Sequence, residues 1–409
     1  MEFFNVKTID RTRELMKQAF DGYALGEERV DIENVLNRVL ASDVRSDVDV
    51  PHFDRSVVDG YAVRTGDADG ASESVPAFLK LIGSVQMGEE NTAVLRENEC
   101  MYVPTGGMVP KGTQAMVMIE HAQKVADDEI AVYRSASMYE NMLRIGDDIR
   151  VGEMVLTKGK RLYAQDIGAL SSTGHREISV YKRPKFAVLS TGDEIISPDS
   201  ELTMGKIKDI NTFALAAQIE SFGGEVAIKK VVVDDFGTIK SEVEKATEKC
   251  DVVLVSGGSS VGEKDYTYEI LKELSGKEII AHGLNIKPGK PTIVADVDGK
   301  PVIGLPGQPA SALMVLTLML DILHEVFYKN VRVKTYVAAK LDQNVASAPG
   351  RKTFQMVQIA QGEHGKVAKV IRGKSGMISL LSKSYGYFVI ESSSEGKEAG
   401  EAVNVYPLQ

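Results

Sequence analysis

The stretch VSGGSSVGEKDY, residues 255–266, begins at the end of an apolar strand and runs through glycine and serine to the start of a helix. The same strand-to-helix pattern recurs on both sides of it. KFAVLSTGDEI (185–195) is an apolar strand entering a polar loop, residues 212–222 predict a helix that stops at a Gly-Gly pair, and EVAIKKVVVDD (225–235) predicts another strand before a helix. Strands alternating with helices are typical of a doubly wound, mostly parallel α/β domain.

The segments that flank this α/β pattern have a different arrangement of apolar residues. Short apolar runs broken by Gly, Pro and Asn predict a small all-β region over residues 78–132, and residues 332–409 predict a small barrel or sandwich. Residues 7–20 and 30–40 predict amphipathic helices. The apolar run ASALMVLTLML (310–320) is too short to span a bilayer at eleven residues, so it predicts a buried core helix.

Composition narrows the class of protein. The chain has 409 residues, which is enough for about two to four domains. Its net charge of −10 argues against a general nucleic-acid or anionic-membrane surface, because phosphate groups require a basic face. Two cysteines far apart in the sequence, Cys100 and Cys250, favour neither a disulfide scaffold nor a zinc site. We therefore expect a cytoplasmic protein.

Polar loops follow the predicted parallel strands at their carboxyl ends, where open α/β sheets bind ligands. The first loop carries Ser190, Thr191 and Glu194, and the second carries Asp234 and Asp235. The third is the SGGSS segment of residues 256–260. Glycines let backbone N–H groups approach an anion closely, and serine hydroxyls add donors, so this composition suits a phosphate. No GK[ST] sequence of a Walker A loop follows. A flexible strand-to-helix connection is the alternative for this loop taken alone.

Two later turns carry further groups suited to an anion. IKPGKP places Lys287 and Lys290 on a turn stiffened by prolines, where paired ammonium groups are able to clamp a phosphate or another oxyanion. GLPGQPAS precedes a helix, so we expect the backbone N–H groups of Gly307, Ala310 and Ser311 to be available to an anion. The alternatives are a solvated turn for the lysines and a plain Pro-Gly turn before the helix.

Acidic residues in polar loops complete this set. Mg²⁺ takes one or two carboxylates together with water and substrate phosphates. A turn cap is the alternative role for any single aspartate. If the acids cluster around the lysine-rich loops, a metal–phosphate site is the better explanation. The candidates are Asp59, Asp147, Asp148, Glu194, Asp234 and Asp265.

These motifs together resemble those of a known family. The chain is similar to the molybdopterin molybdenumtransferases, bacterial relatives of the gephyrin E domain, from about residue 10 to its C-terminus. The order and spacing of the whole set make the resemblance highly specific. The matching stretches are PHFDRSVVDGYAV, VPTGGMVPKGTQAMVMIE, RIGDDI, LSTGDE, GKIKDINTFAL, SGGSSVGEKDY, IKPGKP and GLPGQPASA.

The resemblance implies an α/β plus β fold in an elongated, multidomain chain. A helical dimerisation region is expected from residues 1–47 together with 150–181, and a β lobe is expected from residues 48–149. A doubly wound molybdopterin-binding α/β domain is expected over residues 182–331, and a C-terminal β-barrel over residues 332–409. Family members are homodimers, with the site between the α/β domain of one subunit and the β lobe of the other.

The implied activity is a step of molybdenum cofactor biosynthesis. Molybdate is inserted into adenylylated molybdopterin in a Mg²⁺-dependent reaction that releases AMP. The expected partners are these two substrates, a second copy of the chain and the molybdopterin adenylyltransferase as substrate donor, with no nucleic acid and no membrane. Tungstate could replace molybdate, because it is a tetrahedral dianion of similar size. A gephyrin-like peptide-binding scaffold and a paralogue without transferase activity also fit the resemblance.

The resemblance and the loop chemistry together give the predicted site. The residues expected to carry the chemistry are Asp59, Asp148, Glu194, Asp234, Asp265, Lys287 and Lys290, with Glu194, Asp234 and Asp265 as metal ligands. The residues expected to bind substrate are Thr105, Ser190, Thr191, Ser256, Gly257, Gly258, Ser259, Pro306, Gly307, Pro309, Ser311 and Ser375.

Two positions depart from the family pattern. Gln308 stands where asparagine is usual, which puts a capping or ligand contact there in question. Asp209 stands where a small polar residue is commoner, and it adds negative charge close to an anionic ligand unless it faces away.

Overall fold

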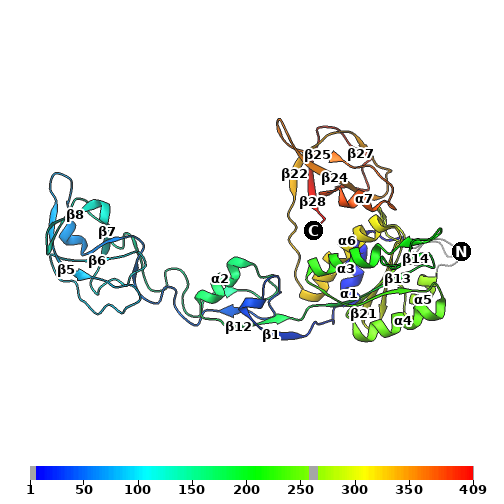
Figure 1. Ribbon diagram of the computed structural model, residues 1–409, viewed down its shortest axis with the longest axis horizontal. Helices are drawn as coiled ribbons and strands as arrows, with labels where there is room; N and C mark the ends of the chain where they lie inside the picture. Colours follow the sequence, from blue (N-terminus) through cyan, green and yellow to red (C-terminus); the bar gives the residue numbers. More distant parts are fainter. Residues whose placement is uncertain (1–5, 258–265, 409) are drawn as a thin grey trace. The chain divides into compact units, whose positions relative to one another are not determined.

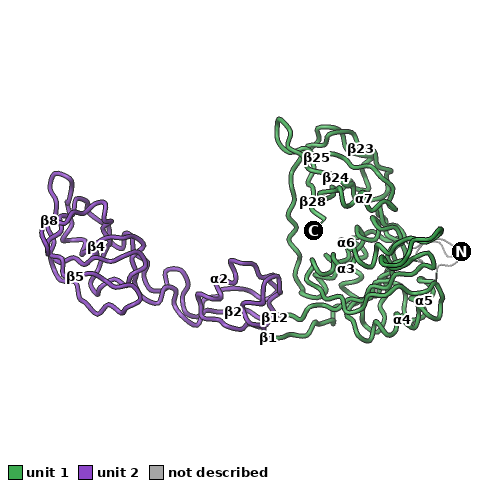
Figure 2. Tube along the Cα trace, in the orientation of Figure 1, with its two compact units in different colours: residues 1–28, 181–409 green, residues 29–180 purple. Residues whose placement is uncertain are grey.

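The computed structural model describes residues 6–257 and 266–408, and the chain divides into two compact units (Figures 1 and 2). Unit 1 combines Met1–Glu28 with Tyr181–Gln409, and unit 2 is Arg29–Val180. The units divide the chain differently from the expected regions, because the N-terminal segment groups with the α/β domain and the barrel.

A six-stranded sheet forms the centre of the α/β part of unit 1. Its strand order is β16-β13-β17-β21-β20-β18, and the first four strands run parallel. Ser190 pairs with Ser256, and Ser256 pairs with Leu305, so three parallel strands end side by side at one edge. The strands are β13 (Lys185–Thr191), β16 (Glu225–Val232), β17 (Val252–Ser256), β18 (Ala281–His282), β20 (Ile293–Val297) and β21 (Lys300–Leu305).

Helices cover both faces of this sheet because its strands are apolar on both sides. Ala187, Leu189, Val253 and Val255 share one core cluster with residues of α4 and α5, and side chains alternate along a strand, so their neighbours face the other way. There α3 packs on α6, and Figure 1 shows the two helix pairs on opposite sides of the sheet. The helices are α3 (Asn211–Phe222), α4 (Phe236–Lys249), α5 (Tyr266–Ser275) and α6 (Pro309–Tyr328).

Helix α6 is the core helix that the apolar run predicted. It is long and apolar enough to cross a membrane by length and composition alone, but 89% of its most apolar window is buried inside the protein. The N-terminal helix α1 (Ile9–Ala19) lies against it, and Arg13 and Lys17 of α1 pair with the buried Glu325 of α6 at 3.2 and 3.1 Å. These ion pairs explain why the first residues of the chain belong to unit 1.

The C-terminal region is a closed β-barrel, as predicted. Its strand order is β24-β25-β22-β28-β26, and β26 pairs again with β24. The short strand β19 (Ile286–Lys287) joins the outside of this sheet, with Lys287 paired to Thr353 of β24. The barrel strands are β22 (Val337–Leu341), β24 (Lys352–Gly362), β25 (Gly365–Val370), β26 (Gly386–Ile390) and β28 (Ala402–Pro407), with helix α7 (Ile378–Ser382) beside them.

Unit 2 contains the predicted all-β lobe, a six-stranded sheet with the order β7-β4-β6-β5-β9-β8. Its core includes Leu79, Cys100 and Ile130. The strands are β4 (Gly60–Val63), β5 (Ala77–Ser84), β6 (Glu99–Val103), β7 (Ala115–Met118), β8 (Ala122–Ala126) and β9 (Glu129–Val132).

The rest of unit 2 is a small cluster around α2 (Ala164–Ser172), in which Val35, Leu40 and Val44 pack with Leu162 and Leu170. The helix predicted over residues 30–40 is wrong. That segment forms part of β1 (Glu27–Asp31), a 3-10 turn (Ile32–Asn34) and a residue with positive φ, Asn37 at 64°. Its apolar residues are buried, but in an irregular chain rather than on one helix face.

Short strand pairs complete the fold. In unit 2 they include β3 (Arg55–Ser56) with β10 (Met142–Leu143) and β2 (Val44–Arg45) with β11 (Met154–Leu156), and β1 pairs with β12 (Glu177–Tyr181) where the chain passes between units. In unit 1 they are β14 (Ile195–Ile196) with β15 (Ile207–Lys208) and β23 (Val345–Ala346) with β27 (Gly396–Lys397).

Candidate active site

A cavity of about 1070 Å³ lies in unit 1 between the carboxyl edge of the α/β sheet and the β-barrel. Most of the described site residues predicted for unit 1 line it. They come from the ends of β13, β16, β17 and β21, from the lysine turn, from the start of α6 and from a barrel loop. These residues are Thr191, Glu194, Asp234, Ser256, Gly257, Lys287, Lys290, Pro306, Gly307, Ser311 and Ser375.

The buried floor of the cavity is formed by polar residues at the strand ends. Thr191 and Ser256 are 3% and 1% exposed. Asn211, the first residue of α3, donates through Nδ2 to Ser256 Oγ at 2.7 Å and to Gly307 O at 2.9 Å. One amide therefore links the end of β17 to the turn before α6. Asn211 lies in the matching stretch GKIKDINTFAL, but it was not among the predicted site residues.

Gly257 allows the adjacent strand ends to approach closely. Its φ is +119°, and a Cβ at this position would lie 2.4 Å from Thr191 O and 2.6 Å from Thr191 Oγ1. Across the cavity floor, a Cβ on Gly307 would lie 3.6 Å from the Gly257 Cα. A side chain at Gly257 is incompatible with both the backbone conformation and the available space.

The cavity wall carries more positive than negative charge. Among the described residues, five basic and two acidic side chains line it. Lys287 and Lys290 were predicted, whereas the barrel adds three basic residues that sequence reasoning did not assign. Two of them lie in the segment RGKSGM, residues 372–377, which also holds the predicted Ser375. Nothing in a single sequence places this barrel loop over the α/β sheet. The added residues are Arg351, Arg372 and Lys374.

The start of α6 is joined to the barrel by Ser375. Its hydroxyl donates to the side-chain carbonyl of Gln308, and its backbone carbonyl accepts from the N–H of Ala310 at 3.1 Å. The expectation that the Ala310 N–H is available to an anion is therefore wrong. Gln308 contacts the barrel in place of capping its own helix. Pro309, the first residue of α6, is absent from the described cavity lining, whereas Gly307 and Ser311 form part of it.

Two residues close to the cavity in sequence face elsewhere. The hydroxyl of Ser190 is buried and lies 2.8 Å from Thr212 Oγ1, so it forms part of the core and not of the cavity lining. Asp209 is buried and accepts from the backbone N–H of Thr212 at 3.1 Å, which caps α3. Its negative charge is thus used at the helix start.

Three predicted residues, Gly258, Ser259 and Asp265, lie outside the described residues.

The remaining predicted residues belong to unit 2. Asp59 and Thr105 lie on the β lobe, where Asp59 Oδ1 accepts from the Thr105 N–H at 2.9 Å. The Asp148 side chain is exposed, and its backbone N–H donates to Val50 O at 3.1 Å. The neighbouring Asp147 accepts from the Arg144 N–H at 2.8 Å, and this bond, together with the ion pair to the same arginine, lowers the pKa of its carboxyl.

Two carboxylates line the cavity. Glu194 is exposed on the wall, and Asp234 is partly buried there. Within residues 6–257 and 266–408, no group of three or more His, Cys, Asp or Glu side chains forms a metal cluster. Because Mg²⁺ usually takes one or two protein carboxylates and completes its shell with water and substrate phosphates, Glu194 and Asp234 fit such an ion.

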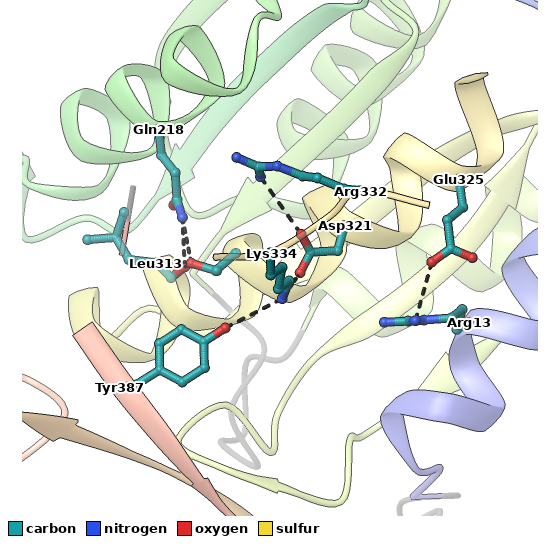
Figure 3. Close-up of polar contacts among 9 residues, drawn as sticks. Arg13, Gln218, Leu313, Asp321, Glu325, Arg332, Lys334 and Tyr387 are labelled. Atoms are coloured by element: carbon teal, nitrogen blue, oxygen red, sulfur yellow. Dashed lines mark hydrogen bonds and ion pairs between the residues drawn. The ribbon is translucent and has the colours of Figure 1, made fainter. Parts of the chain in front are cut away.

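A second cavity of about 600 Å³ lies between α1, α6 and the barrel. Figure 3 shows its buried acids with their basic partners. Asp321 is bound by Lys334 and lies 3.8 Å from Arg332, and Glu325 is paired with Arg13. The charges are compensated within the chain, which indicates a structural role for this cluster.

Comparison with known proteins agrees with this architecture. Residues 7–174 match the family model of the MoeA N-terminal region (domain I and II), residues 187–325 match the "Probable molybdopterin binding domain", and residues 338–408 match the MoeA C-terminal region (domain IV). A putative molybdopterin biosynthesis protein of Methanocaldococcus jannaschii is 35% identical over 391 residues, covering 93% of this chain and 92% of the relative.

Two further matches extend over nearly the whole chain. The molybdopterin molybdenumtransferase of Staphylococcus aureus is 30% identical over 378 residues, covering 92% of this chain and 90% of the relative. The crystal structure of the MoeA protein of Pyrococcus horikoshii superposes with a TM-score of 0.85 at 30% identity, covering 98% of this chain and 100% of that chain. Fold, cavity and matches lead to one conclusion: the chain belongs to the molybdopterin molybdenumtransferase family, transferases of molybdenum cofactor biosynthesis.

Proposed function

We propose that this chain inserts molybdate into adenylylated molybdopterin in a Mg²⁺-dependent reaction and releases AMP. The observation that carries the proposal is one cavity lined by two carboxylates, two turn lysines and the buried polar ends of two parallel strands, β13 and β17. Cations suit the phosphates and the molybdate dianion, and carboxylates suit a divalent cation. In the proposed reaction, two thiol sulfurs bond to molybdenum while two molybdate oxygens leave as two waters, which take two protons from the thiols and two from solvent. A further water cleaves the phosphoanhydride and releases AMP.

The residues of the chain act chiefly by positioning and electrostatics. Lys287 and Lys290 hold terminal oxyanion oxygens, because their ammonium groups are point charges able to follow developing negative charge. The strand-end residues Thr191 and Ser256 form the polar floor, and Gly257 lets the backbone approach the substrate. Ser311 adds a hydroxyl to the lining, and Ser375 joins the start of α6 to the barrel through its bond to Gln308.

Glu194 and Asp234 would hold the Mg²⁺ ion, with Asp265 as a further ligand by resemblance. When bound, the ion supplies charge neutralisation at the phosphates and the oxyanion.

We also propose that the chain works as a cytoplasmic homodimer and receives its substrate from a molybdopterin adenylyltransferase. The roles of Asp59, Thr105 and Asp148 are assigned by the matching family motifs. Light scattering at micromolar concentration tests the dimer, and a monomer at that concentration contradicts it.

The decisive experiment is AMP release from adenylylated molybdopterin, followed by chromatography with and without molybdate and Mg²⁺. We expect release that requires both, together with formation of molybdenum cofactor. Tight binding of the nucleotide without release would instead favour a carrier or an inactive paralogue. Repeating the assay with tungstate compares the two oxyanions directly.

A further inference from the structure

Two buried polar atoms on the floor of the cavity have no hydrogen-bond partner among the described residues: Asn211 Oδ1 and Thr191 Oγ1. Their residues are 7% and 3% exposed, and both residues line the cavity. Leaving a buried acceptor or hydroxyl without a partner is unfavourable, so each such atom requires an explanation. Both lie beside the Ser256–Gly257 peptide, where three parallel strands end.

The orientation of the Asn211 amide follows from its partners. Its nitrogen lies 2.9 Å from the carbonyl oxygen of Gly307, which is able only to accept. Reversing the amide would place two acceptors against each other, so the NH₂ group must face Gly307 and Ser256. The remaining oxygen, Oδ1, is therefore an acceptor.

An acceptor-only atom does not suit a phosphate or molybdate oxygen, because these groups also only accept. It requires a donor from the ligand. We propose that Asn211 is a specificity-determining residue that accepts a hydrogen bond from an N–H of the nitrogen heterocycle of the substrate, with the Thr191 hydroxyl as a second contact. This inference rests on the proposed function, whose substrate carries N–H groups on both its pterin and its adenine.

A second amide on α3 provides an internal comparison. Gln218 donates through Nε2 to Leu313 O at 3.3 Å and to Thr317 Oγ1 at 2.6 Å, and its Oε1 is also buried without a partner among the described residues. Figure 3 shows it directed toward Leu313 on α6, and it is absent from the described cavity lining. An unpartnered amide oxygen alone therefore does not mark a ligand site, and position on the cavity floor distinguishes Asn211.

The test uses ligand analogues that lack one N–H group, and then a protein variant that lacks the Asn211 acceptor. Dissociation constants are measured by calorimetry for AMP against purine riboside 5′-monophosphate, which lacks the 6-amino group, and for pterin against N3-methylpterin. We expect the wild type to favour the donor-bearing member of one pair by roughly three- to tenfold, the range of one neutral hydrogen bond. Asn211→Ala is expected to abolish that preference.

If the preference lost in Asn211→Ala is that between the two nucleotides, the heterocycle is adenine. If it is that between the two pterins, the heterocycle is pterin. A purely structural role for Asn211 weakens both members of a pair equally and leaves their ratio unchanged, which would overturn the inference. A wild type that binds both members of each pair equally would also overturn it. A wild type that binds neither a nucleotide nor a pterin would overturn the proposed function as well, so the two failures are distinguishable.

Two further variants guard against misfolding. Gln218→Ala, matched in side-chain type and helix, is expected to leave all four dissociation constants unchanged. Thr191→Val replaces an unpartnered hydroxyl by a methyl group, so we expect an equal or higher Tm and a weaker affinity for the donor-bearing ligand. If Asn211→Ala does not fold, the ratio measured with Asn211→Ser decides, and an unchanged ratio there counts against the proposal.

Discussion

The carboxylate of Asp59 accepts a hydrogen bond from the backbone N–H of Thr105 at 2.9 Å, which joins two predicted site residues across 46 positions of the chain. The bond connects the residue before β4 to the turn after β6, two neighbouring strands of the β lobe. Asp59 therefore has two separable properties: an acceptor that holds a turn, and a negative charge.

These properties are separated by two substitutions. Asp59→Asn keeps an acceptor for the Thr105 N–H and removes the charge, whereas Asp59→Ala removes both. If the charge acts in the reaction, we expect Asp59→Asn to keep the wild-type Tm and to lose about 100-fold in kcat, a typical cost of removing one electrostatic group. AMP release and thermal unfolding are the measurements. Full activity in Asp59→Asn would leave Asp59 only the role of holding the turn.

The adjacent acids Asp234 and Asp235 are expected to differ in function. Asp234 lines the cavity, whereas Asp235 caps α4. Asp235 accepts from Thr238 Oγ1 at 2.7 Å and from the Thr238 N–H at 2.9 Å, and these bonds lower the pKa of its carboxyl. We expect Asp234→Asn, like Glu194→Gln, to lower AMP release at least tenfold and to raise the Mg²⁺ concentration needed for half-maximal rate. Asp235→Asn is the control, with a lower Tm and an unchanged Mg²⁺ requirement. Equal Mg²⁺ requirements in all three variants would contradict the ligand assignment.

Gly257→Ala is expected to disrupt the floor of the cavity. The new methyl group would overlap the Thr191 carbonyl, and the backbone there is left-handed, so we expect a loss of about 1–3 kcal/mol or more in unfolding free energy together with weaker nucleotide binding. Gly276→Ala is the control, because its φ is +56° but nothing lies within 4 Å. Similar Tm losses in the two variants would show that backbone strain, not crowding against Thr191, dominates.

Asp321, a buried acid of the second cavity, is expected to contribute to the stability of the protein and not to substrate binding. Asp321→Asn leaves Lys334 and Arg332 without their buried counter-charge (Figure 3). Breaking a fully buried pair costs about 3–5 kcal/mol, and we expect a smaller loss here because the two basic side chains are 34% and 31% exposed. We expect a lower midpoint in urea and an unchanged KM for the nucleotide substrate. Glu401→Gln, which breaks the surface pair with Lys397, is the control and is expected to change neither quantity. A changed KM in Asp321→Asn would give the second cavity a part in substrate binding.

Alkaline pH is expected to destabilise the β lobe through Cys100. Burial raises the pKa of its thiol to about 12, whereas an unfolded thiol titrates near about 8.5. Between these values the unfolded state loses the proton and the native state keeps it, so the free energy of unfolding falls as pH rises. We expect the fall between about pH 9 and 11 to be shallower in Cys100→Ala.

Parallel pH curves for the wild type and Cys100→Ala would contradict this assignment. Alkylation provides an independent check, because native Cys100 is expected to resist iodoacetamide at about pH 9 and to react after unfolding in urea.

Local sequence chemistry predicted the strand ends of the α/β domain well. Apolar strands followed by Ser, Thr and Gly identified Thr191 and Ser256, because parallel strands bring their carboxyl ends to one edge whatever the rest of the chain does. The lysine turn was predictable because its two lysines lie close together on a turn stiffened by prolines. Such features depend on residues close together in sequence.

Features that depend on contacts between distant segments were not predictable. The Ala310 N–H is taken by Ser375, and Arg351 reaches the cavity, only because the barrel packs over the start of α6. Asn211 gains its position from Ser256 and Gly307, both far along the chain. The segment of residues 30–40 has helical periodicity, yet tertiary packing of its apolar residues overrides it.

Strand β19 couples the backbone of Lys287 to the β-barrel. The lysine is part of the α/β segment by sequence, but its backbone is paired with Thr353 in the sheet of the barrel. Any tilt of the barrel therefore carries this cation with it, and the cavity is not able to open like a hinge without moving one of its own charged groups. Removing the barrel by truncation would release the lysine turn, so the α/β domain excised alone is expected to lack a functional anion clamp.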